Sequence, residues 1–143
     1  MKPMNQTQFQ FPSHSVNEGF ARAAVSAFLA QLDPTVADLT ELKTAVSEAV
    51  TNAIVHGYRD KIGQVYITVK LFESGKAVVR IRDKGCGIPD ISKAMEPLYT
   101  TGGEERAGLG FSVMQSFCDA VRVTSGEGRG TSVTLTKHFA PKE

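Results

Sequence analysis

The sequence predicts a single domain over residues 1–143 with an α+β fold: a two-layer sandwich in which a mixed, mainly antiparallel sheet carries helices on one face. Segments 65–83 and 121–135 each contain two stretches of alternating apolar and polar residues joined by a glycine-containing turn, as β-hairpins do. Segments 16–32 and 39–54 instead repeat apolar residues at helical spacing. Because each strand then has one apolar face and each helix one apolar stripe, the two must pack as layers.

The N-terminal part is predicted to contribute one strand and one helix. Alternation over residues 6–11 indicates a short strand, which Pro12 ends. Ser15 and Glu18 have the spacing of a capping box, so we expect them to begin the helix 16–32.

A second helix is predicted after Pro34, and Gly57 is expected to stop it. Its apolar stripe comprises Leu39, Leu42, Val46, Ala49, Val50, Ala53 and Ile54. We expect this stripe to pack on the sheet.

The region between the two hairpins is predicted to form a loop followed by a third helix. Residues 97–107 are polar, with Gly102 and Gly103 in their middle, and we interpret them as a mobile lid. Apolar residues then recur at helical spacing over 109–117.

Composition narrows the class of protein. A content of 41% hydrophobic and 22% charged residues suits one compact domain. The net charge is +1 and the Lys and Arg residues are spread along the sequence, which argues against nucleic acid or a membrane as the main partner. The two cysteines, Cys86 and Cys118, favour neither a zinc site nor a disulfide framework and suit a cytoplasmic location. With no apolar N-terminal signal and no long apolar segment, neither export nor a membrane anchor is expected.

Three short motifs point to a function: Glu-x-x-x-Asn on a helix, Asp-x-Gly-x-Gly after a strand, and Gly-Leu-Gly-Phe before another helix. The residues concerned are Glu48, Asn52, Asp83, Gly85, Gly87, Gly108, Leu109, Gly110 and Phe111. From average residue frequencies, all three motifs would occur by chance in roughly one of several thousand such chains. Together they predict a pocket for a nucleotide and its metal ion.

Asp83 shares a strand face with Val79 and Ile81, so its carboxylate is predicted to point toward the apolar layer. A lone carboxylate there needs donors, and the amino group of an adenine lodged between sheet and helices would supply one. Thr131 faces the same layer, and its hydroxyl is expected to help hold the base, directly or through water. The alternative for Thr131 is an ordinary strand threonine, and the alternative for Asp83 is a strand-end carboxylate that caps the turn at Gly85 and Gly87.

Glu48 and Asn52 are four residues apart on the second helix, so both project from one side at the margin of the apolar stripe. An amide oxygen is a hard ligand that can help to hold Mg²⁺ beside phosphates. A carboxylate one turn away can accept a proton from an attacking hydroxyl. The alternative is a solvated helical pair without a functional role.

Gly108 and Gly110 flank Leu109 immediately before the third helix, where backbone amides can approach an anion such as phosphate. The alternative is an ordinary junction between a loop and a helix. We expect Arg106, like Glu48, to be a catalytic residue. Three residues of the lid segment are expected to touch the terminal phosphate when the lid closes: Thr100, Thr101 and Arg106.

The three motifs resemble the N, G1 and G2 boxes of the GHKL ATPase superfamily. Further stretches are similar to the family of sporulation anti-sigma-F factors: FLAQLDP (28–34), SEAVTNAIVHGY (47–58) and LTKH (135–138). This resemblance implies the Bergerat, histidine-kinase-like ATPase fold and binding of ATP with Mg²⁺. It also implies a homodimer that holds sigma F inactive and phosphorylates a serine on an anti-anti-sigma protein, regulating sporulation transcription.

The resemblance also implies roles for individual residues. Glu48 would be the base acting on the substrate serine, Asn52 the Mg²⁺ ligand and Asp83 the adenine contact. The glycines of the second and third motifs would form the nucleotide loops. Glu18 and Arg22 would lie near the surface that meets sigma F or the anti-anti-sigma substrate.

One departure from the family is the pair Gly102-Gly103, where the family usually has lysine and proline in a lid one residue longer. Because of this departure, the sequence does not determine how the lid closes or the turnover rate. Two other functions stay open: a general-stress anti-sigma-B type serine kinase, and a nucleotide-gated module that sequesters a sigma factor without significant kinase activity. The catalytic domain of a histidine kinase is disfavoured, because the sequence offers no dimerisation hairpin before the domain.

Overall fold

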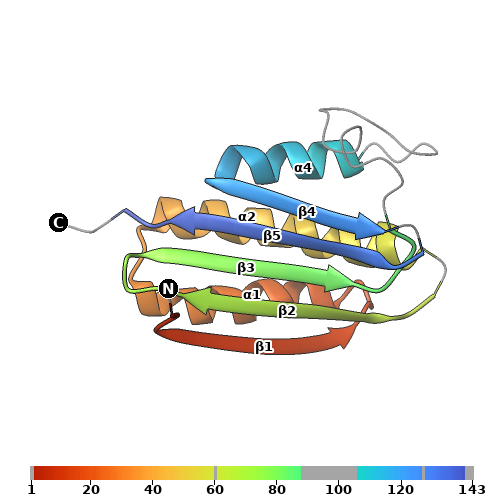
Figure 1. Ribbon diagram of the computed structural model, residues 1–143, viewed down its shortest axis with the longest axis horizontal. Coiled ribbons are helices and arrows are strands. Elements are labelled where there is room, and N and C mark those ends of the chain that lie inside the picture. Colours follow the sequence, from red (N-terminus) through yellow and green to blue (C-terminus); the bar gives the residue numbers. More distant parts are fainter. Residues whose placement is uncertain (1, 60, 88–105, 127, 141–143) are drawn as a thin grey trace.

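A five-stranded antiparallel sheet forms one layer of the protein, and helices cover one of its faces (Figure 1). The computed structural model describes residues 2–59, 61–87, 106–126 and 128–140. The strands are β1 (Asn5–Pro12), β2 (Gln64–Leu71), β3 (Lys76–Asp83), β4 (Ala120–Gly126) and β5 (Gly130–His138). They lie in the order β1-β2-β3-β5-β4.

The helices form the second layer. They are α1 (Asn17–Leu29), the 3₁₀ turn η1 (Ala30–Leu32), α2 (Val36–Asn52), the π-helical turn η2 (Ala53–Gly57) and α4 (Arg106–Phe117). Figure 1 shows them on one side of the sheet, where α1 contacts β2, α2 contacts β3 and β5, and α4 contacts β4. The α2 helix contacts both other helices, so it is the centre of this layer.

The predicted fold class is confirmed, with one difference in the sheet. Every pairing among the described strands is antiparallel, so the sheet is not mixed. Between β1 and β2 the chain crosses the sheet twice, through α1 and α2, and therefore returns antiparallel to β1. Among the described residues, α4 lies between β3 and β4 along the chain, but in the sheet β5 lies between these two strands and pairs antiparallel with both.

Because apolar and polar residues alternate along the strands, the apolar ones form the core between the sheet and the helices. On β2, for example, Val65, Ile67, Val69 and Leu71 are almost completely buried, whereas the residues between them are more exposed. The buried strand residues pack in one cluster with the apolar stripes of α1 and α2. The open face of the sheet is correspondingly polar, as predicted.

The helix starts differ in how they are capped. The predicted capping box of Ser15 and Glu18 is wrong: α1 has no side-chain cap, and the Glu18 carboxylate accepts a hydrogen bond of 2.8 Å from the Ser47 hydroxyl instead. A tertiary partner has therefore replaced the local one. The start of α2 is capped by Thr35, whose hydroxyl accepts a hydrogen bond from the Asp38 amide at 3.1 Å.

The third helix begins earlier than predicted. Arg106 and Ala107, the last two residues of the predicted lid, belong to α4. The remainder of the lid, including Thr100, Thr101 and the Gly102-Gly103 pair, lies outside the described residues. Within the described residues no helix is long and apolar enough to cross a membrane.

The cap of α2 generates a stability prediction. Thr35→Ala should lower the free energy of unfolding by about 1 kcal/mol, because the Asp38 amide loses its acceptor. Thr44→Ala is the matched control on the same helix: its hydroxyl only donates back to the Thr40 carbonyl, so the change should be neutral or slightly stabilising. Urea unfolding of both variants measures the difference, and equal losses would contradict the assigned cap.

Candidate functional site

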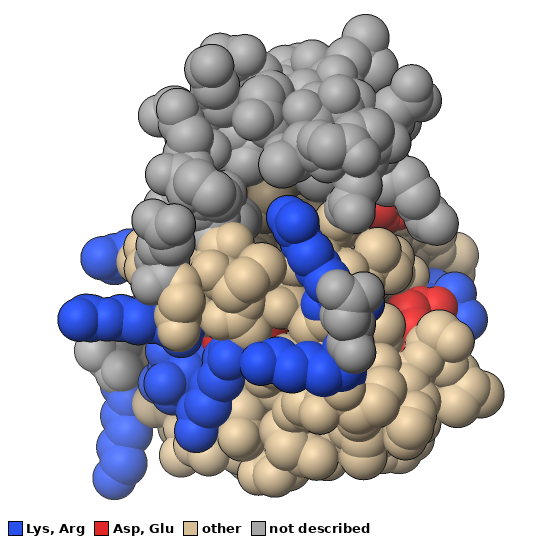
Figure 2. All heavy atoms as spheres, turned by 90° about the vertical axis from the view of Figure 1, so that its right-hand side faces the viewer, with Lys and Arg blue, Asp and Glu red and all other residues tan. Residues whose placement is uncertain are grey.

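The three motifs meet at one end of the sandwich, where β3 and the α2-η2 helix both end (Figure 1). Figure 2 views the molecule from this end. A Cβ atom placed on Gly57 would lie 2.7 Å from the Asp83 carboxyl carbon, so the end of the helix that carries the first motif contacts the second motif. A Cβ atom on Gly110 would lie 3.2 Å from both the Glu48 carboxylate and the Asn52 amide. The first and third motifs therefore also converge.

Asp83 is buried with only 5% of its surface exposed, as strand parity predicted. Burial raises the pKa of its carboxyl, while hydrogen bonds from the Gly85 and Thr131 backbone amides oppose that rise. The Gly85 bond measures 2.9 Å, so the carboxylate does cap the turn. Capping and base recognition are compatible, because an ionised carboxylate accepts several hydrogen bonds.

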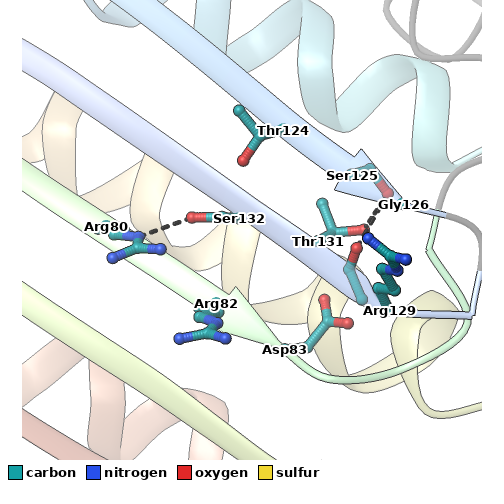
Figure 3. Close-up of a pocket in the computed structure, with 10 residues that line it drawn as sticks. Arg80, Arg82, Asp83, Thr124, Ser125, Gly126, Arg129, Thr131 and Ser132 are labelled. Atoms are coloured by element: carbon teal, nitrogen blue, oxygen red, sulfur yellow. Dashed lines mark hydrogen bonds between the residues drawn. The ribbon is translucent and has the colours of Figure 1, made fainter.

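Thr131 is also buried and lies opposite Asp83 in the β3-β5 register. Its hydroxyl forms a 3.0 Å hydrogen bond with the Ser125 hydroxyl of β4, as Figure 3 shows. The prediction for this hydroxyl is a contact with the base, directly or through water, which the described residues alone do not test. A role of Thr131 in holding a base therefore stays a prediction.

The loop after β3 is fixed by close backbone packing. The Cys86 amide donates to the Gly57 carbonyl at 3.0 Å, and the Gly128 amide donates to the Cys86 carbonyl at 2.8 Å. A Cβ atom on Gly85 would collide with the Gly57 carbonyl, and Gly87 has a φ of 78°, which favours glycine. The glycines of the second motif are thus required by the packing of the loop, whatever ligand it holds.

Two contributors to this loop were not predicted as site residues. The Tyr58 hydroxyl accepts a 2.6 Å hydrogen bond from the Lys84 amide and donates to the Gln64 carbonyl at 2.7 Å, so it ties the loop to β2. A Cβ atom on Gly130 would collide with the Asp83 carbonyl. Sequence spacing gives no signal for either contact, because each joins segments that are distant along the chain.

Glu48 and Asn52 are half-buried on the side of α2 that faces Gly110. The Asn52 amide nitrogen is fully buried and has no hydrogen-bond partner among the described residues. A buried amide of this kind favours a polar ligand, because an unmade hydrogen bond is costly. The π-helical turn η2 follows Asn52 directly, and such turns occur frequently at functional sites.

The third motif occupies the first turns of α4 rather than the loop before it, because the helix begins at Arg106. The first four amides of a helix have no partner within that helix, so the Gly108 amide is available to an anion. The Gly110 amide lies beyond this group. Its lack of a side chain instead allows α4 to approach Glu48 and Asn52 closely.

The residues present fit a nucleotide with its metal ion. Asn52 offers a buried amide without a hydrogen-bond partner among the described residues, and α4, whose first amides are free, packs against it at Gly110. Among the described residues, no group of three or more His, Cys, Asp or Glu side chains is arranged to hold a metal. A magnesium ion at Asn52 would therefore take most of its ligands from phosphate oxygens and water, as Mg²⁺ commonly does.

Comparison with known proteins identifies the family of this chain. The family model described as "Histidine kinase-like ATPase domain" matches residues 11–137. The curated protein "Anti-sigma F factor" from Thermoanaerobacter sp. (strain X514) is 54% identical over 141 residues, covering 97% of both chains. The protein of the same name from Geobacillus kaustophilus is 54% identical over 138 residues, covering 95% of this chain and 94% of that one.

Solved structures support the fold. A structure of RsbU and RsbW domains from Mycobacterium tuberculosis matches with a TM-score of 0.71 at 21% identity, covering 96% of this chain and 32% of that one. A histidine kinase domain from Erythrobacter litoralis matches with a TM-score of 0.55 at 19% identity, covering 85% of this chain and 61% of that one. At these identities the likeness concerns the fold alone. The sequence matches go further: the chain belongs to the histidine kinase-like ATPase domain family and, within it, to the anti-sigma F factors.

Proposed function

We propose that the protein binds and inhibits sigma F and, as an ATP-dependent serine kinase, phosphorylates the anti-anti-sigma antagonist, thereby regulating sporulation transcription. The observation that carries this proposal is the convergence of Glu48, Asn52 and Gly110 next to the buried Asp83 end of the sheet. The name of the relatives supports sigma F as the partner. This function belongs in the cytoplasm, where sigma factors meet RNA polymerase.

ATP is the proposed nucleotide, and each motif has a part in holding it. Asp83 accepts a hydrogen bond from the adenine amino group, with Thr131 beside it and the loop of Gly85 and Gly87 around it. The start of α4, with Gly108, Leu109 and Gly110, receives the phosphates. Asn52 holds Mg²⁺, which supplies neutralisation of the phosphate charge when bound. Thr100, Thr101 and Arg106 are proposed to contact the terminal phosphate.

Glu48 is the proposed general base. Its carboxylate accepts the proton of the substrate serine hydroxyl as the serine oxygen bonds to the γ-phosphorus. The bond between that phosphorus and the oxygen of the ADP leaving group breaks in the same transfer. Arg106 is proposed to stabilise the charge on the transferred group. Correct positioning of serine and phosphate then supplies most of the rate enhancement.

The surface of α1 is the proposed meeting point for sigma F or its antagonist. Glu18 and Arg22 form an ion pair at 3.7 Å, with 21% and 46% of their side chains exposed. Val16 and Phe20 beside them are 80% and 55% exposed, so this face offers apolar surface to a partner. A homodimer, as implied by the family, is part of the proposal.

A second candidate, a nucleotide-gated module that sequesters the sigma factor, has one observation in its favour. The Ser47 hydroxyl donates to the Glu18 carboxylate at 2.8 Å, and Ser47 directly precedes Glu48. The nucleotide site is therefore joined to the proposed partner surface through one hydrogen bond. A general-stress anti-sigma-B type kinase would share the same chemistry, but the relatives at 54% identity carry the sigma F name.

The kinase proposal predicts the effect of Glu48→Gln. Transfer of labelled phosphate from ATP to the anti-anti-sigma protein should fall by about 10²-fold or more, because the amide cannot accept the serine proton. Binding of ATP and sigma F should persist. Glu73→Gln, in the exposed turn between β2 and β3, is the matched control and should leave transfer unchanged. Undiminished transfer in Glu48→Gln would refute the role of the base while leaving sequestration possible.

The buried carboxylate predicts a separation of binding from folding. Asp83→Asn should weaken ATP binding by about 10-fold or more in calorimetry, because the amide spoils the match to the adenine amino group. Asp119→Asn, at the opposite end of the sheet, should leave affinity unchanged. Equal ATP affinity in Asp83→Asn and the unmodified protein would exclude Asp83 as the base contact.

Comparison with the same variant also predicts how the stability of the protein depends on pH. Burial raises the pKa of Asp83 above its ordinary 3.8, so the folded protein holds the proton more tightly than the unfolded chain. Relative to Asp83→Asn, the unmodified protein should therefore lose stability as the pH rises through the folded-state pKa. Urea unfolding of the nucleotide-free proteins from pH 4 upward measures this, and a constant difference between the two proteins would contradict the shift.

A further inference from the structure

The open face of the sheet, on the side away from the helices, is basic. By the strand register, its outward-facing cationic residues are Lys70, Lys76, Arg80, Arg82 and Arg122. No Asp or Glu occupies an outward position on the five described strands. In a chain whose net charge is only +1, this is a strong asymmetry. Figure 2 shows Lys and Arg side chains projecting to the left, the side on which this face lies.

A hollow of about 390 Å³ lies at one end of this face, where β3 and β4 end and β5 begins (Figure 3). Arg80 and Arg82 of β3 and Arg129 of the β4-β5 turn border it, with the hydroxyls of Thr124 and Ser132 between them. We call these five residues the arginine patch. Asp83 also borders the hollow, but its carboxylate is buried and bonded to backbone amides.

The arginines of this patch lack acidic partners in the described part of the chain. Arg80 donates from Nε to the Ser132 hydroxyl at 2.7 Å, which fixes its guanidinium across two strands. No ion pair joins Arg80, Arg82 or Arg129 to a carboxylate of the described residues. Guanidinium groups bind carboxylates through paired hydrogen bonds, and neighbouring hydroxyls add further donors.

We propose that the arginine patch is a docking site for an acidic segment of a protein partner, one rich in Asp and Glu. Charge complementarity carries the choice of occupant. Single-stranded nucleic acid fits less well, because sheet surfaces that bind it stack bases on exposed aromatic rings. The only aromatic residue at an outward position of the described strands is Tyr66, and the Lys84 ammonium lies 4.9 Å from the centre of its ring.

A second copy of this chain also fits less well, because two such faces would oppose arginine with arginine. The α1 surface proposed for sigma F or its antagonist lies in the helical layer, on the other side of the sheet. Docking at the arginine patch would therefore leave the α1 surface free. The two surfaces would allow the protein to hold two partners at the same time.

The test uses the full chain with a fluorescent poly-glutamate peptide as the probe and a poly-glutamine peptide as its neutral counterpart. Binding is measured by anisotropy and mapped by amide chemical shifts. One variant combines Arg80→Gln, Arg82→Gln and Arg129→Gln, and a second carries Glu at the same positions. Lys43→Glu, on α2, is the control for a charge change in the helical layer. Circular dichroism confirms that every variant is folded.

We expect the poly-glutamate peptide alone to bind, with shifts confined to β3, β4 and β5 around the patch. The Kd should rise by about 10-fold in the Gln variant, since each exposed pair contributes only modestly, and by more in the Glu variant. Lys43→Glu should bind as the unmodified protein does. Equal affinity in all variants, or shifts centred on the helices, would overturn the proposal.

Two further results would also overturn it. A single-stranded oligonucleotide that binds the patch more tightly than the peptide would make it a nucleic-acid site. Self-association that the Gln and Glu variants abolish would make it an interface between copies of this chain.

Discussion

The burial of the Asp83 carboxylate at the end of β3 is the constraint on which the site depends. A buried carboxylate requires donors, and here the Gly85 and Thr131 amides meet part of that need. Because one of these amides belongs to the loop after β3 and the other to the start of β5, their hydrogen bonds to Asp83 bring the two segments together. The approach is so close that neither Gly57 nor Gly130 has room for a side chain. The carboxylate can still accept further hydrogen bonds, and the amino group of a base can donate one.

The second half of the site follows from how α2 and α4 pack. Because Gly110 has no side chain, α4 lies directly against Glu48 and Asn52, and the free amides of its first turn are held near them. One helix therefore presents the polar side chains, and the other presents its positive end. Ser47 extends this arrangement to α1, since its hydroxyl bonds the Glu18 carboxylate. The candidate site on α2 and the proposed partner surface on α1 are thus joined by one hydrogen bond.

Periodicity predicted those parts of the structure that depend on a single element. Strand parity placed the Asp83 side chain in the apolar layer, and helical spacing placed Glu48 and Asn52 on one side of α2. Contacts between distant segments gave no such signal. Tyr58 ties the loop to β2 across the fold, and Ser47 replaces the local cap predicted for Glu18. The early start of α4 has the same origin, because packing on α2 outweighs the low helix propensity of its glycines.

In the proposed function, the buried end of the sheet binds adenine while α2 and α4 hold the phosphates and magnesium. A crystal structure with a non-hydrolysable ATP analogue and Mg²⁺ tests this most directly. We expect the adenine amino group within hydrogen-bond distance of the Asp83 carboxylate, and the metal on the Asn52 amide oxygen. A base bound away from Asp83, or phosphates remote from the start of α4, would contradict it.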